Sequence, residues 1–248
     1  MKIVATIEAR LNSSRLPKKH LLKIKNKYII ELLINRLKKI KNISKIIIST
    51  TNNSIDKKLV NIAKKNNIGF YQGSENNVLE RVLHSAQKYS SDAIFQVSGD
   101  CPLIDYKLAD FQISMFKKNK VDIATEYWKN FPAGVCAPVI KTSALKESLK
   151  KAKSVEDFEH VTNYIFHNQK KFKILYFLAP DEFFAPNLEF LLDEFEDFKF
   201  LQKIMEYDRK NMFQTRELIN LCREKKIKNK KNIIRKNKNI KKFINLSK

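Results

Sequence analysis

The segment KIVATIEARLNSSRLPKKHL, residues 2–21, decides the fold and raises the first question about function. Its first six residues form a short, mostly apolar run, which is typical of a buried strand in a parallel sheet. The residues that follow carry the basic side chains of Arg10, Arg15 and Lys19 among small polar ones. Two interpretations are open at this point: a solvated loop that happens to be basic, or a cradle for a strongly anionic ligand.

Apolar runs alternate with amphipathic segments over the first hundred residues. Apolar residues at i, i+3, i+4 and i+7 predict helices over 28–40, 54–66 and 77–89, and short apolar runs predict strands at 2–7, 45–50, 68–72 and 92–99. This alternation predicts an α/β fold with a mostly parallel sheet and helices on both faces. Ligands of such sheets bind beyond the carboxyl ends of the strands, so we expect the opening loop and SGDCPLID (98–105) to face one crevice.

The pattern changes from about residue 121. Two strands of a separate, hairpin-like arm are predicted at about 121–141. The sequence then predicts helices over 142–152 and 156–167 and a strand at 172–179. It also predicts a strand ending at Asp193, a helix from about 194 and a last helix over about 214–224. We therefore expect one domain over 1–224 and a Lys/Asn-rich tail over 225–248.

The charge of the chain is strongly basic. The 248 residues carry a formal net charge of +23, and 225–248 hold eleven basic side chains and no acid. Because the excess is mostly Lys, with only eight Arg, we interpret it as a solvated, compositionally biased surface rather than a nucleic-acid site. A non-catalytic nucleic-acid-binding protein that uses the tail is the alternative.

The sequence also argues against several classes of protein. It has no run of about 18 apolar residues and no signal peptide, so we expect no membrane span and a cytoplasmic location. Its three cysteines are widely separated, which predicts neither a disulfide framework nor a zinc site. The chain has only four glycines, at Gly69, Gly73, Gly99 and Gly134, and these positions are expected to need a positive φ or a close backbone approach.

The opening loop has a composition suited to phosphate. It contains no glycine, so it is neither a P-loop nor a dinucleotide-binding loop. Ser13 and Ser14 offer hydroxyl donors, and Asn12 tolerates the left-handed conformation that a tight loop would ask of glycine. The two arginines offer planar forks for phosphate oxygens, and Lys19 offers a point charge. The composition fits a triphosphate, although spacing alone leaves the solvated loop open.

Two acidic residues are candidate ligands of Mg²⁺. Asp100 lies in a Gly-Asp turn after a buried strand, and Asp193 ends the apolar run LEFLL. The alternative for Asp100 is a turn or helix-capping residue, and for Asp193 it is the N-cap of the following helix. Together with the basic loop, these two acids would form a site for a metal and a triphosphate.

The loop EARLNSSRLPKKHL resembles the A-R-x-G-S-x-R-L-P-x-K segment of the sugar cytidylyltransferases. That family includes CMP-Kdo synthetase, acylneuraminate cytidylyltransferase and the spore-coat polysaccharide cytidylyltransferases, to which the chain is most similar. Five further segments match in the family's order: GSENNVLERV (73–82), VSGDCPLID (97–105), FPAGV (131–135), EHVTNYI (159–165) and LDEFEDFKFLQKI (192–204). The resemblance covers roughly residues 1–205.

This resemblance implies a glycosyltransferase-A-like nucleotidyltransferase fold and a homodimer. It implies transfer of CMP from CTP to an acidic sugar, a nonulosonic or Kdo-like acid, with release of pyrophosphate for surface polysaccharide synthesis. Catalysis would rest on Arg10, Arg15, Lys19 and Asp100, with Mg²⁺ on Asp100 and Asp193. The nucleotide would be bound by Ala9, Arg10, Asn12, Ser13, Ser14, Arg15, Lys19, Gly73, Ser74, Asn77, Arg81 and Gly99, and the sugar by Gly134, Glu159 and His160.

The chain departs from the family pattern at several positions. Asn12 and Lys18 stand where the family's loop has glycine, so we expect altered geometry there. FPAGVCAPVI lacks the acidic residues that relatives carry, which leaves the acceptor less defined than the nucleotide. A sugar-phosphate nucleotidyltransferase that uses another nucleoside triphosphate is therefore an alternative. His160 also has an alternative, as a half-buried helical histidine satisfied by local contacts.

Overall fold

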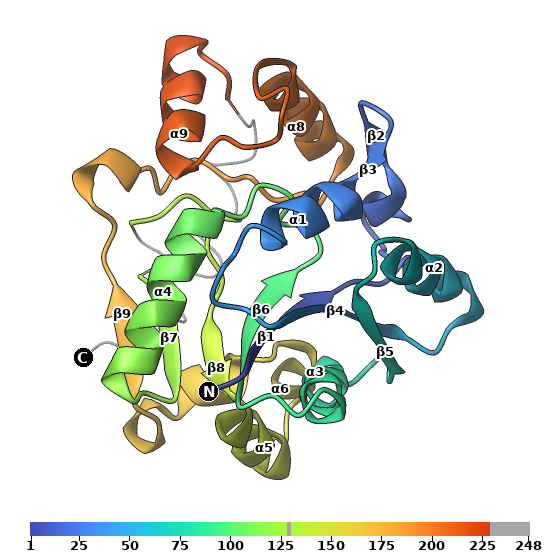
Figure 1. Cartoon of the computed structure of the whole chain (residues 1–248), viewed down its shortest axis with the longest axis vertical. Coiled ribbons are helices and arrows are strands. Elements are labelled where there is room, and N and C mark those ends of the chain that lie inside the picture. Colours follow the sequence, from blue (N-terminus) through green and yellow to red (C-terminus); the bar gives the residue numbers. More distant parts are fainter. Residues whose placement is uncertain (128–129, 229–248) are drawn as a thin grey trace.

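The main sheet has seven strands in the order β5-β4-β1-β6-β8-β7-β9 (Figure 1). The computed structural model describes residues 1–127 and 130–228. The strands are β1 (Ile3–Glu8), β4 (Lys45–Thr51), β5 (Gly69–Gly73), β6 (Ala93–Ser98), β7 (Ile123–Glu126), β8 (Val139–Lys141) and β9 (Ile174–Phe177). Among them, β8 alone runs antiparallel to its neighbours. The predicted mostly parallel sheet is confirmed.

Helices cover both faces of this sheet (Figure 1). The bounds are α1 (Ile29–Leu37), α2 (Lys57–Lys65), α3 (Val78–Lys88), α4 (Tyr106–Asn119), α5 (Thr142–Lys151), α6 (Val155–Glu159) and α7 (Asn163–His167). Side chains from α1, α2 and α4 pack on one face around Ala5 of β1, and those from α3, α5 and α7 on the other around Val4. Because successive strand residues point to opposite faces, β1 is apolar on both sides, as a central parallel strand requires.

The order of the strands fixes where a ligand can bind. The chain runs from β1 to β4 and β5 on one side, and then returns to β6 on the other side of β1. The carboxyl ends of β1 and β6 therefore lie at the point where the strand order reverses, which is the usual ligand crevice of open α/β sheets. Glu8 and Ser98, the last residues of these two strands, are paired in register.

Several predicted elements differ from the structure. The strands predicted near 121–141 pair with each other as β7 and β8, but they extend the main sheet instead of forming a separate arm, because β8 also pairs with β6. The strand predicted to end at Asp193 is absent, and that segment makes one isolated bridge, Ala133 to Glu189. The helix predicted over 156–167 is broken into α6 and α7, because the backbone at His160 is extended. α4 has no counterpart among the predicted elements.

Two further helices pack at one end of the sheet. α8 (Phe195–Tyr207) and α9 (Thr215–Glu224) lie beside α1 at the top of Figure 1 and share a hydrophobic cluster with Ile29 and Leu32. A small hairpin, β2 (Lys23–Ile24) and β3 (Lys27–Tyr28), precedes α1.

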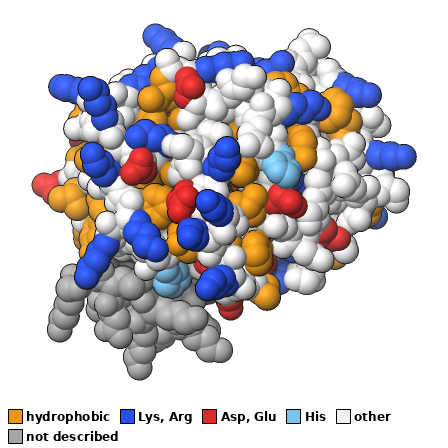
Figure 2. All heavy atoms as spheres, turned by 90° about the horizontal axis from the view of Figure 1, so that it is seen from below, with side chains coloured by type: hydrophobic (Ala, Val, Ile, Leu, Met, Phe, Trp, Pro, Cys, Tyr) orange, Lys and Arg blue, Asp and Glu red, His pale blue; other side chains and the backbone are white. Residues whose placement is uncertain are grey.

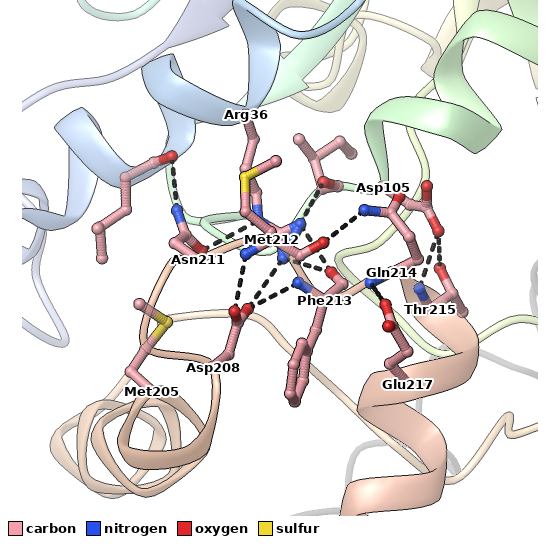
Figure 3. A network of polar contacts seen from close by, with 12 residues as sticks. Arg36, Asp105, Met205, Asp208, Asn211, Met212, Phe213, Gln214, Thr215 and Glu217 are labelled. Atoms are coloured by element: carbon pink, nitrogen blue, oxygen red, sulfur yellow. Dashed lines mark hydrogen bonds and ion pairs between the residues drawn. The ribbon is translucent and has the colours of Figure 1, made fainter.

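Arg36 of α1 holds the loop between α8 and α9 (Figure 3). Its side chain is fully buried, with Nε donating to Asn211 Oδ1 at 3.1 Å, Nη1 donating to the Phe213 carbonyl at 2.9 Å and Nη2 lying 3.5 Å from Asp208 Oδ2. Nearby, Asp105 caps α4 and also accepts hydrogen bonds from the backbone and hydroxyl of Thr215. These contacts attach the α8–α9 pair to the sheet domain.

Basic side chains are spread over the face of the molecule seen in Figure 2 and form no continuous basic patch there. Lys and Arg side chains there alternate with acidic and apolar ones. Within the described part of the chain, no helix has both the length and the apolar character needed to cross a bilayer. The tail predicted over 225–248 falls mostly outside the described residues, so its boundary stays a prediction.

Candidate functional site

A cavity of about 1040 Å³ opens at the carboxyl ends of β1 and β6. Its wall includes the predicted site residues Ala9, Arg10, Ser13, Ser14, Arg15, Lys19, Arg81, Asp100, Glu159, His160 and Asp193. The wall does not include Asn12, Gly73, Ser74, Asn77, Gly99 and Gly134. The basic loop and the two candidate metal ligands therefore meet. The strand order accounts for the meeting of the loop with Asp100, but not for the place of Asp193.

Lys19 lies at the centre of the site. Its ammonium donates to Asp100 Oδ2 at 2.7 Å and to Asp193 Oδ1 at 3.0 Å, and only 7% of the residue is exposed. Burial alone would lower the pKa of Lys19, but the charges and hydrogen bonds of the two carboxylates outweigh it and raise that pKa. Burial likewise opposes the ionised form of Asp100, yet Lys19 lowers the pKa of Asp100. The site thus holds a charged lysine between two carboxylates.

Asp193 reaches this position through a long-range backbone contact. The Leu192 amide donates to the Asp100 carbonyl at 2.9 Å, which sets the two acidic residues side by side. The N-cap of α8 is Glu194, and the capping carboxylate that receives the amides of Asp193 and Glu194 belongs to Asp197. The capping alternative for Asp193 is therefore wrong.

The basic loop is held by a buried acid that sequence patterns did not single out. Asp56 is fully buried, accepts from the Leu11 amide at 2.8 Å and also bonds the hydroxyl of Thr51. The loop closes where the Lys18 amide donates to the Leu11 carbonyl at 2.9 Å. Lys18 has φ 58° and ψ 24°, the left-handed conformation expected of the family's glycine. Asn12, which would also tolerate that conformation, does not adopt it.

The two arginines of the loop reach in different directions. Arg15 Nη2 lies 3.2 Å from Asp193 Oδ2, and Arg10 Nη1 lies 3.3 Å from Glu75 Oε1 across the cavity. Glu75 is also held by Asn53, whose side-chain amide donates to it at 2.6 Å. Both arginines are substantially exposed, so these pairs are weak and can exchange for phosphate oxygens.

His20 and Gly99 pack the floor of the site. The His20 Nδ1 lies 3.1 Å from the Gly99 carbonyl, and the ring is 3% exposed. Burial first, and then the charge of Lys19, lower the pKa of His20 to about 4, so the ring is neutral at pH 7. A Cβ on Gly99 would stand 2.9 Å from both the Glu8 carbonyl and the His20 ring. Glycine at position 99 therefore lets the backbone come close to the Glu8 carbonyl and the His20 ring. Among the four glycines, only Gly134 has a positive φ, of 87°.

The remaining predicted nucleotide residues lie beside the cavity. Asn77 caps α3 by accepting from the Glu80 amide at 2.9 Å. The Ser74 carbonyl accepts from Arg81 Nη1, which ties the segment before α3 to the cavity wall. Their direct contact with a nucleotide stays a prediction.

The segment from α6 to α7 forms another part of the cavity wall. α6 starts with a capping box of Ser154 and Asp157, and Asn163 of α7 donates to Asp157 Oδ1 at 2.7 Å. Glu159, the last residue of α6, and His160, which follows it, are exposed and line the cavity. The interpretation of His160 as a half-buried, locally satisfied helical residue is therefore wrong.

Polar residues within the apolar strands also line the cavity. Glu8 of β1 and both Gln96 and Ser98 of β6 lie on its wall, and Gln96 Nε2 donates to Glu8 Oε2 at 3.0 Å. Sequence reasoning missed these residues because they belong to segments that are otherwise apolar. A carboxylate at the end of a buried strand, directly before the basic loop, is the signal that identifies Glu8.

The donor set fits a divalent metal shared with a substrate. Among the described residues, no group of three or more His, Cys, Asp or Glu side chains forms a site that could hold a metal alone. Asp100 and Asp193 provide two carboxylates within reach of one Lys19 ammonium. Mg²⁺ in phosphoryl-transfer sites is commonly held by one or two carboxylates together with phosphate oxygens and water, so the pair suits that arrangement.

A family model described as Cytidylyltransferase matches residues 4–243. The chain belongs to this family. Its curated relatives include an uncharacterized protein of Methanocaldococcus jannaschii, which is 34% identical over 207 residues, 84% of each chain. They also include the spore coat polysaccharide biosynthesis protein SpsF of Bacillus subtilis, which is 27% identical over 208 residues, 82% of this chain and 85% of the relative.

Solved structures agree with this cytidylyltransferase assignment. A cytidylyltransferase from Leptospira borgpetersenii is similar with a TM-score of 0.88 and 30% identity, covering 93% of this chain and 98% of that one. CMP:2-keto-3-deoxy-manno-octonic acid synthetase, solved with CTP, shares the fold with a TM-score of 0.63 and 15% identity, covering 84% and 100%. The sequence resemblance and the nucleotidyltransferase fold are confirmed, and the chain is a CTP-dependent nucleotidyltransferase by family.

Proposed function

We propose that this cytidylyltransferase transfers CMP from CTP to an acidic sugar, a nonulosonic or Kdo-like acid, for surface polysaccharide synthesis. The observation that carries the proposal is that Arg10, Arg15 and Lys19 line the same cavity as Asp100 and Asp193. The Bacillus subtilis relative is named for spore coat polysaccharide biosynthesis, and the synthetase that shares this fold is named for an acidic sugar.

The charges of the cavity support a metal-assisted triphosphate site. Four Arg and Lys side chains and five Asp and Glu side chains line it, so the chain alone offers no excess of positive charge for a triphosphate. Asp100 and Asp193 would hold Mg²⁺, which would supply the missing charge and polarise the phosphate oxygens. Arg15 and Lys19 would then turn from these carboxylates toward the phosphates.

The residues of the chain act by positioning and by charge. A hydroxyl oxygen of the acceptor attacks the α-phosphorus, a new P–O bond forms, the bond to pyrophosphate breaks, and the hydroxyl proton is lost to solvent. Lys19 and the two arginines would neutralise charge on the phosphates as the leaving group departs. Glu159, His160 and Thr162 also line the cavity, and they would orient the acceptor.

The deciding experiment measures pyrophosphate release from CTP. With Mg²⁺ present, we expect release only when an acceptor is added, and a panel of nonulosonic acids, Kdo-like acids and sugar 1-phosphates identifies its class. Thermal shifts with CTP, UTP, GTP and ATP separate this proposal from use of another nucleotide. If a sugar phosphate supports faster pyrophosphate release than every acidic sugar, the proposed class of acceptor is wrong. If another nucleotide gives a larger thermal shift than CTP, the proposed use of CTP is wrong.

A nucleic-acid-binding function has less support. The six sequence segments that resemble the cytidylyltransferases lie within residues 8–204, outside the basic tail, and the cavity contains most of the predicted site residues. If the tail binds nucleic acid, deletion of 225–248 should abolish a steeply salt-dependent affinity for DNA or RNA. We expect that deletion to leave CTP-dependent pyrophosphate release in place.

We further propose a cytoplasmic homodimer. Apolar side chains are exposed near the edge strand β9, with Leu178 71% exposed and Phe111 of α4 52% exposed. An edge strand with exposed apolar neighbours is a common site of association between copies. Light scattering coupled to size-exclusion chromatography tests the dimer, and an Asp substitution at Leu178 should shift it toward the monomer.

A further inference from the structure

The two candidate metal ligands are paired with cations of the chain itself. Lys19 Nζ donates to Asp100 Oδ2 at 2.7 Å and to Asp193 Oδ1 at 3.0 Å. The other oxygen of Asp193, Oδ2, lies 3.2 Å from Arg15 Nη2. All four residues line the cavity, and the side chains of Asp100 and Asp193 are 17% and 12% exposed, so the group can be reached from the cavity.

The two cations hold the carboxylates with different strength. Although burial lowers the pKa of Lys19, the two carboxylates outweigh it and raise that pKa, so the ammonium stays charged. The Lys19 side chain is 9% exposed, whereas that of Arg15 is 57% exposed. Opposite charges attract more strongly where water is excluded, and exposed pairs contribute little. Lys19 is therefore the main competitor of any second cation for these oxygens.

A metal and Lys19 cannot share the two carboxylates at low cost. Divalent cations such as Mg²⁺ bind carboxylate oxygens directly. A divalent cation on the oxygens that Lys19 holds would repel its ammonium, and this repulsion is large in a partly buried site. Binding by both ligands therefore requires the lysine side chain to leave them. Leaving without a new partner is unfavourable as well, because it strands a charged group in a mostly buried position.

A triphosphate would offer Lys19 a new anionic partner. The backbone around the lysine is held in place, since the Lys18 amide donates to the Leu11 carbonyl at 2.9 Å and the Leu21 amide donates to the Lys18 carbonyl at 2.8 Å. The lysine side chain itself is a flexible stem with a compact charge at its end. Rotation of the side chain alone can therefore carry the ammonium from the carboxylates to phosphate oxygens.

We propose that Lys19 competes with the metal for Asp100 and Asp193, so that the protein binds a divalent cation strongly only together with a triphosphate. The inference rests on the proposed CTP site and concerns the order in which that site is filled. Without a triphosphate, the two acids stay paired with Lys19 and a free cation is bound weakly. Because such coupling is reciprocal, the cation should strengthen triphosphate binding by the same factor.

The test measures binding of Mn²⁺ without nucleotide, from the loss of the electron paramagnetic resonance signal of the free ion. Wild type should bind weakly. Lys19→Met should bind Mn²⁺ about 10- to 100-fold more tightly, because it removes a positive charge beside the ligands. Lys19→Arg keeps the charge and should stay as weak as wild type. Arg15→Met removes only the exposed pair with Asp193 and should tighten binding less than Lys19→Met does.

Further variants show where the gain in affinity arises. In the Lys19→Met background, Asp193→Asn should abolish the gain, because it removes one of the two ligands. Lys18→Met removes an exposed charge outside the cavity wall and should bind Mn²⁺ as wild type does. Melting curves confirm that the variants fold, and Lys19→Gln, which keeps a hydrogen-bond donor, replaces Lys19→Met if that variant is unstable.

Calorimetry of CTP binding tests the coupling from the other side. Mn²⁺ should strengthen CTP binding by a larger factor in wild type than in Lys19→Met, where the carboxylates are open to the cation in both states. Equal factors would contradict the inference. So would a Lys19→Met variant that binds Mn²⁺ no more tightly than wild type, or a gain that survives Asp193→Asn.

The proposed function can fail or stand independently of these results. It is tested by pyrophosphate release from CTP, which does not depend on how weakly the free chain binds a cation. If wild type releases no pyrophosphate from CTP with any acceptor, the proposed function fails, and the Mn²⁺ titrations still decide whether Lys19 competes with a cation. If release is observed and the titrations show no competition, the inference alone is wrong.

Discussion

Lys19 Nζ donates to Asp100 Oδ2 at 2.7 Å, and this contact joins the loop after β1 to the turn after β6. The pair brings together the cation meant for a triphosphate and a carboxylate suited to its metal. We predict that Lys19→Ala and Asp100→Ala each lower turnover of CTP by ~10²-fold or more, because each removes charge that the transferring phosphate needs. Steady-state pyrophosphate release measures the effect.

The control for this prediction is the neighbouring lysine. Lys18 is exposed and lies outside the cavity wall, so Lys18→Ala removes the same charge without reaching the site. We expect it to keep turnover close to that of wild type. If Lys19→Ala or Asp100→Ala also keeps a near wild-type rate with CTP while remaining folded, the catalytic assignment is wrong.

Arg36 is predicted to be a major determinant of stability. Arg36→Met would leave Asp208, whose side chain is 1% exposed, without its cation, and the Phe213 carbonyl without its donor (Figure 3). Removing one partner of a buried ion pair destabilises by about 3–5 kcal/mol, and we expect a loss of that size in urea unfolding. Arg216→Met removes an exposed pair with Glu182 and should change stability by less than about 1 kcal/mol. Equal effects of the two substitutions would contradict the role of burial.

The parts of the fold that depend on local patterns could be predicted from the sequence. The alternation of apolar runs and amphipathic helices gave the parallel half of the sheet, and the strand order then placed Lys19 opposite Asp100. The prediction of a separate arm was wrong because no local pattern shows that Val139–Lys141 pairs with β6. Likewise, Asp193 meets Asp100 through the Leu192 amide, a contact across some ninety residues that periodicity does not encode.

The parts of the site that sequence reasoning missed lie inside apolar elements. Glu8 and Gln96 occupy single positions of two strands and meet only because β1 and β6 are neighbours in register. Asp56 supports the loop through the Leu11 amide, although it reads as an ordinary helix-start residue. These residues belong to the site because of the residues they contact in the fold, and their residue types alone do not reveal those contacts.

Lys18 is predicted to be a strained position. A side chain at φ 58° is unfavourable by about 1–2 kcal/mol in the left-handed region, which glycine visits freely. After allowance for the greater freedom of glycine in the unfolded chain, Lys18→Gly should raise the free energy of unfolding by about 0.5–1 kcal/mol. Urea unfolding measures it. Lys18→Ala keeps the Cβ and should bring no such gain, so a gain from both would point to the charge instead of the backbone.

Glu8 is predicted to make the stability of the protein depend on pH. Burial raises its pKa in the fold to about 7 from an ordinary value of 4.5, so the folded chain holds this proton more tightly than the unfolded chain does. Its favourable contribution is complete below pH 4.5 and is lost as the pH rises through 7. Glu8→Gln does not titrate there, so its stability relative to wild type should increase by about 2 kcal/mol between pH 5 and pH 8. Urea unfolding at the two pH values measures this difference. Glu147→Gln, at an exposed position, should follow wild type at both, and a Glu8→Gln variant that does the same would show that Glu8 is not a buried, titrating group.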